Sequence, residues 1–73
     1  MKVWITRDSD GDDRCCLFRK NPSQENHVGG VCYYADPVHT FFSANARIFK
    51  KNLGFTPRKG SCKLYEIDIK EIK

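Results

Sequence analysis

The side chains most able to do chemistry in this chain are the Lys and Arg residues of its second half. From Pro37 through Tyr65 the sequence contains no Asp or Glu. The same segment carries these six basic residues: Arg47, Lys50, Lys51, Arg58, Lys59 and Lys63. Clustered positive charge attracts phosphate backbones and acidic protein surfaces. We therefore expect these six residues to bind an anionic partner.

The spacing of the first three basic residues indicates a common surface. On a helix, residues three and four apart are neighbours, so Arg47, Lys50 and Lys51 form one ridge, which the other three can extend from the following loop. Tyr33 and Tyr34 could stack on nucleic-acid bases if they are exposed. The alternative is that the ridge is the solvated side of an amphipathic helix and that the tyrosines belong to the core.

Residue types used in catalysis are present but not in a recognised arrangement. The sequence contains no G-x-S-x-G, P-loop or H-E-x-x-H motif. His27 lies in a polar stretch and His39 in the first turn of the expected helix, where a histidine is usually an ordinary surface residue. We expect no enzymatic activity.

An acidic turn at residues 8–13 has the oxygen-rich composition of a calcium loop. The match fails in detail, because the sixth position is Asp13 where that motif needs Gly and the twelfth is Arg19 where it needs Glu. Asp and Gly are also the residues that favour a tight reversal between strands. The sequence therefore predicts a hairpin turn here.

The four cysteines admit two interpretations. They are Cys15, Cys16, Cys32 and Cys62. Without an export signal we expect four reduced thiols used as small apolar side chains. The alternative is a zinc site that combines cysteines with His27 and His39. Two adjacent cysteines cannot easily face one ion, and no pair has the usual short gap, so we predict no metal and no cofactor.

Length and composition indicate a single small domain over residues 1–73. The chain is 40% hydrophobic and 30% charged, with a net charge of +4. Its apolar runs are far shorter than the roughly 20 residues that a membrane span needs. Met1 and Lys2 lead directly into a strand-like segment without an apolar signal region. We expect a cytoplasmic protein that does not contact membranes.

A helix is predicted over residues 36–54. Asp36 and Pro37 form a start signal and Gly54 a stop signal. An apolar stripe lies between them: Val38, Phe41, Phe42, Phe49 and Leu53. Ser43 is a competing cap, which would leave Phe41 and Phe42 in an extended approach to a shorter helix.

Strands are predicted on both sides of this helix. They cover residues 2–7, 14–20, 31–35 and 62–70, with residues 21–26 as a polar loop. In the first strand Val3 and Ile5 should share one face and Trp4 the other. In the last strand Tyr65, Ile67 and Ile69 alternate with mostly charged residues, which predicts a sheet covered on one side only. The predicted fold is α+β: a small, mainly antiparallel sheet of about four strands, in chain order β-β-β-α-β, with one helix packed on one face.

Two segments resemble a group of small proteins encoded by phages and prophages. Residues 4–11 read Trp4-Ile5-Thr6-Arg7-Asp8-Ser9-Asp10-Gly11, which is similar to the W-I-x-R-D-x-D-G hairpin that opens those proteins. A Lys-Asn-Pro step at 20–22, and the closing Gly-x-Cys loop and alternating strand within 55–73, resemble them as well. The resemblance implies an origin in a mobile element and binding to a host protein, such as a defence nuclease or the transcription machinery. It assigns no role to any residue.

Together these features predict a small non-enzymatic binding module, phage-encoded, that inhibits or redirects a host protein or nucleoprotein complex in the host cytoplasm. An inhibitor of the anti-defence or anti-CRISPR type is one concrete form. The alternative is a small DNA- or RNA-binding protein that uses the basic ridge directly. The identity of the target and the oligomeric state are left open by the sequence.

Overall fold

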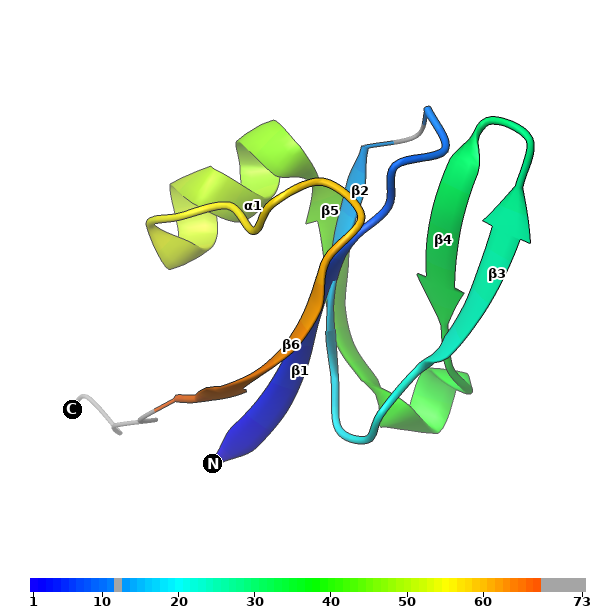
Figure 1. Ribbon diagram of the computed structural model, residues 1–73. Coiled ribbons are helices and arrows are strands. Elements are labelled where there is room, and N and C mark those ends of the chain that lie inside the picture. Colours follow the sequence, from blue (N-terminus) through cyan, green and yellow to red (C-terminus); the bar gives the residue numbers. More distant parts are fainter. Residues whose placement is uncertain (12, 68–73) are drawn as a thin grey trace, which may run out of the picture.

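The computed structural model describes residues 1–11 and 13–67, and Figure 1 shows their arrangement. Four antiparallel strands form the main sheet in the order β5-β2-β1-β6. They are β1 (Lys2–Arg7), β2 (Arg14–Phe18), β5 (Thr40–Asn45) and β6 (Cys62–Glu66). A separate hairpin consists of β3 (Ser23–His27) and β4 (Gly30–Tyr34). The helices are a 3-10 turn, η1 (Pro37–His39), and α1 (Ala46–Leu53). The predicted α+β class with a mainly antiparallel sheet and one packed α-helix is confirmed.

One face of the main sheet packs against α1. The buried residues of this core are Val3, Ile5, Cys15, Leu17 and Phe49. Phe49 is fully buried and is the residue that α1 inserts into the core. Its ring lies 6.0 Å from that of Phe42 and 5.9 Å from that of Phe55, which in turn lies 5.6 Å from the ring of Tyr65. Aromatic pairs at these separations stabilise a core beyond the area they bury.

The other face of the sheet is covered by the β3–β4 hairpin, so the molecule has three layers (Figure 1). Its buried residues are Cys16, Phe18 and Tyr33, with Trp4 packed against them. The prediction of a sheet covered on one side only is therefore wrong, while the opposite orientations of Val3 and Trp4 are confirmed. The sequence does not predict this cover, because β3 reads Ser-Gln-Glu-Asn-His, is exposed throughout, and lies within the predicted loop 21–26 except for its last residue, His27.

The start of α1 differs from the prediction. Asp36 and Pro37 begin only the 3-10 turn, and residues 40–45 form β5, in which Phe42 pairs with Leu17 of β2. The helix begins at Ala46, and Asn45 caps it by accepting a hydrogen bond of 2.9 Å from the Ile48 amide. The predicted helix start at Asp36 and the alternative cap at Ser43 are therefore both wrong. The alternative did predict correctly that the backbone of Phe41 and Phe42 is extended. The local start signal was overridden because a strand edge of β2 was available for pairing.

The predicted apolar stripe is accordingly divided between elements. Val38 is 71% exposed in the 3-10 turn, and Phe41 contacts the guanidinium of Arg19, whose Cζ lies 4.0 Å from the ring centroid. Only Phe49 and Leu53 of the stripe belong to α1. The predicted stop is confirmed, because Gly54 has φ 85° and its amide donates to the Lys50 carbonyl.

The remaining strand boundaries also shift. β2 ends at Phe18, where the pairing with β5 changes register, so Arg19 and Lys20 lie outside it. The predicted strand 31–35 is β4, one residue earlier at each end. In β6 the predicted alternation is confirmed at Tyr65, which packs on the helix side of the sheet together with Ile67. The strand prediction for residues 68–70 lies outside the described residues.

The cap at Asn45 gives a direct test of where the helix begins. Asn45→Ala should lower the free energy of unfolding by about 1 kcal/mol, because the Ile48 amide loses its acceptor. Asp36→Ala is the matched control and should change it by less than about 0.5 kcal/mol, since the Asp36 side chain forms no cap hydrogen bond. Urea unfolding followed by circular dichroism measures both. A larger loss in the Asp36 variant would contradict this helix start.

Candidate functional site

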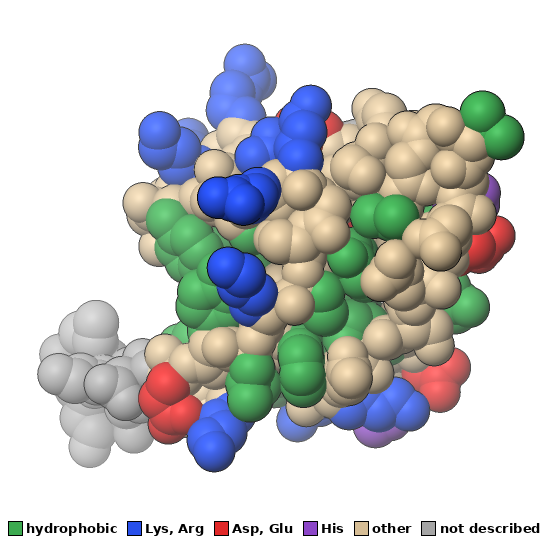
Figure 2. All heavy atoms as spheres, viewed as in Figure 1, with side chains coloured by type: hydrophobic (Ala, Val, Ile, Leu, Met, Phe, Trp, Pro, Cys, Tyr) green, Lys and Arg blue, Asp and Glu red, His purple; other side chains and the backbone are tan. Residues whose placement is uncertain are grey.

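The six basic residues singled out from the sequence are all exposed. Arg47, Lys50 and Lys51 lie on α1, Arg58 and Lys59 on the loop after it, and Lys63 on β6. Figure 2 shows Lys and Arg side chains gathered over α1 and this loop. We call these six residues the basic surface.

Hydrogen bonds hold the loop of the basic surface against the main sheet. The Arg7 guanidinium donates to the Pro57 carbonyl (3.1 Å), and the Gly60 amide donates to the Arg7 carbonyl (2.8 Å). Ser61 closes the turn by donating its hydroxyl to the Arg58 carbonyl (2.6 Å). Arg58 and Lys59 therefore extend from a fixed backbone, which reduces the entropy lost when a partner binds.

The Asp13 carboxylate, which lies near the basic surface, is engaged by Arg7. Asp13 accepts a hydrogen bond of 2.7 Å from Arg7 Nε, and this bond holds the pKa of the Asp13 carboxyl below its ordinary value. The nearby charge of Lys59 acts in the same direction but more weakly. The ion pairs between described residues involve the amino terminus, Arg7, Arg14 and His27, and none involves the basic surface. Its six charges are thus available to a partner as far as the described residues show.

Apolar side chains accompany the charges. Ile48 is 45% exposed and Leu53 36% exposed on α1, and Phe55 is 36% exposed on the loop. Partly exposed apolar groups beside charged ones supply the two components of a protein-binding patch, an apolar centre and a polar rim.

The two tyrosines predicted as aromatic contacts are placed elsewhere. Tyr33 is only 4% exposed, belongs to the core under the hairpin, and donates its hydroxyl to the Gly60 carbonyl (2.6 Å). It cannot stack on a base. Tyr34 is 50% exposed. Because it follows Tyr33 in β4, its side chain points away from the main sheet, on the layer opposite α1. The fold does not bring these tyrosines to the basic surface.

The cysteines are free thiols, as the sequence predicted. Cys15 and Cys16 are buried on opposite faces of β2. Burial raises the pKa of Cys15 to about 11 and also raises the pKa of Cys16. Both serve as small apolar side chains, since an inaccessible protonated thiol is a poor nucleophile and a poor ligand.

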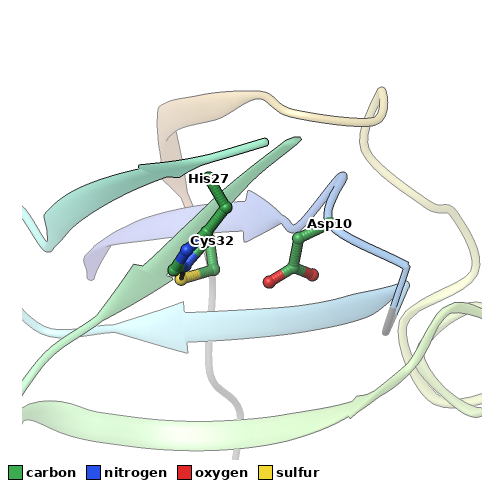
Figure 3. A group of neighbouring side chains, drawn as sticks. All are labelled: Asp10, His27 and Cys32. Atoms are coloured by element: carbon green, nitrogen blue, oxygen red, sulfur yellow. Dashed lines mark hydrogen bonds between the residues drawn. The ribbon is translucent and has the colours of Figure 1, made fainter. Parts of the chain in front are cut away.

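Cys32 belongs to a group of side chains that the sequence did not predict. Its sulfur lies 3.3 Å from Nε2 of His27, and ligand atoms of Asp10, His27 and Cys32 all lie within 4.8 Å of one another (Figure 3). Desolvation raises the pKa of Cys32, and the carboxylates of Asp10, Asp8 and Glu25 raise it further. The signal was missed because His27 and Cys32 come together only through the pairing of β3 with β4.

The thiols should differ in reactivity. In the native protein at about pH 8.5, Cys32 should react with iodoacetamide at least about tenfold faster than Cys15, because Cys15 is fully buried with its pKa raised to about 11 whereas Cys32 is partly exposed. Peptide mass mapping over time measures the two rates, since trypsin separates Cys32 from the peptide that holds Cys15 and Cys16. Equal rates in the folded protein would contradict the burial of β2. Unfolding in urea should equalise them.

In the described part of the chain, no helix has the length and apolar character required to cross a membrane. The α-helix found there, α1, has eight residues and carries three of the six basic side chains. Comparison of the chain with protein-family models, with curated proteins and with solved structures gives no match.

Proposed function

We propose that this chain is a non-enzymatic binding module that docks its basic surface on an acidic protein partner and inhibits or redirects it. The observation that carries the proposal is the exposure of six Lys and Arg side chains without an ion pair to any described acid. Such a field attracts acidic surfaces and accelerates association with them.

A protein is favoured over nucleic acid as the partner for two reasons. Ile48, Leu53 and Phe55 lie among the charges and supply apolar area of the kind found at protein interfaces. Single-stranded nucleic acid, in contrast, is held by aromatic stacking combined with positive charge. Of the two predicted stacking residues, Tyr33 is buried and Tyr34 lies on the opposite layer.

The resemblance of residues 4–11 to the opening hairpin of phage-encoded proteins supports a host protein or nucleoprotein complex as the target. A phage product that blocks a defence nuclease, or an effector of the anti-CRISPR type, needs no catalytic centre of its own. Occupying an acidic surface of the target is sufficient for inhibition. The site of action in this proposal is the host cytoplasm.

Charge reversal tests the basic surface. Lys50→Glu with Lys51→Glu should abolish recovery of a stoichiometric partner from host lysate by the tagged protein. With the partner purified, calorimetry should show at least about tenfold weaker binding, because like charges are then brought together. Lys2→Glu with Lys20→Glu is the matched control, since it changes the net charge equally at exposed positions outside the basic surface. Retention of the partner by both folded variants would contradict the proposal.

Direct nucleic-acid binding is the alternative, and salt dependence separates it from the proposal. We expect no mobility shift of duplex or single-stranded fragments at micromolar protein and about 150 mM salt, because phosphate contacts alone bind weakly at that salt and neither predicted tyrosine lies on the basic surface. A shift that persists there, falls steeply with added salt, and disappears in the Lys50/Lys51 variant would favour the alternative. The Lys2/Lys20 variant serves again as the control.

A further inference from the structure

Three side chains from two separate segments converge at one end of the β3–β4 hairpin. His27 is the last residue of β3, Cys32 lies in β4, and Asp10 belongs to the turn that follows β1. Their ligand atoms lie within 4.8 Å of one another, and Figure 3 shows the three side chains directed toward a common point. We infer that Asp10, His27 and Cys32 bind a divalent transition-metal ion of the zinc class.

The hairpin register places two of these ligands. His27 pairs with Gly30, and Glu25 pairs with Cys32, so Glu25, His27 and Cys32 project from the same face of the hairpin. The distance of 3.3 Å between His27 Nε2 and Cys32 Sγ follows from this arrangement. His27 and Cys32 are five positions apart in the sequence and meet across a turn, so they do not form a recognised metal-binding motif.

The third ligand is fixed by a tight contact between the turn and β4. Ser9 donates its amide to the Val31 carbonyl (2.8 Å), and its hydroxyl accepts from the Val31 amide (3.0 Å). The backbones approach so closely that a Cβ on Gly30, which has φ 139°, would lie 2.2 Å from the Ser9 carbonyl oxygen. Because Ser9 is held at β4, the next residue, Asp10, is held beside Cys32.

The distance between His27 and Cys32 suits a tetrahedral ion. Zinc binds imidazole nitrogen at about 2.0 Å and thiolate sulfur at about 2.3 Å, which places two such ligands roughly 3.5 Å apart. The 3.3 Å between His27 Nε2 and Cys32 Sγ is close to that separation. The carboxylate of Asp10, whose ligand oxygen lies within 4.8 Å of both atoms, would move closer to complete a three-ligand set, and water can occupy the fourth position.

The donor set selects the class of metal. One sulfur, one nitrogen and one oxygen suit zinc and its neighbours, whereas calcium and magnesium prefer oxygen alone. The surroundings are acidic as well: Glu25 Oε1 lies 3.7 Å from His27 Nε2, and the charges of Asp8, Asp10 and Glu25 act on Cys32. Binding releases the Cys32 thiol proton to solvent, and the ion then offsets the repulsion between the thiolate and these carboxylates.

Cobalt titration of the purified full chain tests the site, because thiolate ligation of Co²⁺ produces a charge-transfer band in the near ultraviolet. We expect this band to saturate at one ion per chain in the presence of a non-thiol reductant. Added Zn²⁺ should displace Co²⁺ and remove the band. Cys32→Ser should abolish the band. His27→Gln and Asp10→Asn should each weaken binding by at least about tenfold. Zn²⁺ should also slow the alkylation of Cys32.

Two control variants locate the site within the chain. Cys62→Ser and His39→Gln change the same residue types away from the proposed ligands and should leave the titration unchanged. Far-ultraviolet circular dichroism shows whether each variant is folded. If Cys32→Ser does not fold, Asp10→Asn supplies a milder change at the same site. The inference is overturned by the absence of a saturable band, by an unchanged band in folded Cys32→Ser, or by loss of the band in either control.

Discussion

The buried carboxylate of Asp8 joins the layers of this molecule, and the positions of both candidate sites depend on it. Asp8 is 1% exposed; its Oδ1 accepts from the Tyr33 amide (3.1 Å) and its Oδ2 lies 3.5 Å from Arg14 Nε. Burying a charge costs free energy unless the charge is paired and hydrogen-bonded. Moving the hairpin would remove the hydrogen bond from the Tyr33 amide to the Asp8 carboxylate, so this bond favours the observed position of the hairpin. An isolated two-stranded hairpin is marginally stable at best, and its attachment through Asp8 makes it part of the fold. Tyr33 then reaches the Gly60 carbonyl and so links β4 to the loop of the basic surface.

Elements defined by local pattern could be predicted from the sequence. The alternation in β1, the acidic turn after it, the apolar face of β6 and the helix stop at Gly54 each follow from neighbouring residues. The failures concern pairing between distant segments. β3 contains no residue type that favours strands and is a strand because β4 pairs with it. Residues 40–45 carry a helix-compatible stripe but pair with β2, a contact between segments far apart in the sequence.

In the candidate sites, too, features set by neighbouring residues could be predicted and features set by pairing between distant segments could not. That the Lys and Arg side chains would be exposed could be expected from their charge alone. Strand alternation also predicts that Tyr33 and Tyr34 point in opposite directions, but which of them is buried depends on which face of the hairpin packs on Cys16 and Phe18 of the main sheet. The group of Asp10, His27 and Cys32 requires both the hairpin register and the contact of Ser9 with Val31. A single sequence gives no sign of either pairing.

Asp13 of the acidic turn lies close to Lys59 of the basic surface, but its ion-pair partner is Arg7. Lys59 is near enough for its charge to lower the pKa of Asp13, yet the carboxylate of Asp13 bonds to Arg7. Asp8 is likewise engaged by Arg14 and by a backbone amide. Arg7 also holds the loop backbone at Pro57, so one partly buried guanidinium both occupies an acid and supports the segment that presents Arg58 and Lys59. Asp8 and Asp13 therefore act within the framework, and in the part of the chain that the structure describes the Lys and Arg side chains of α1 and the following loop remain exposed, where an anionic partner can reach them.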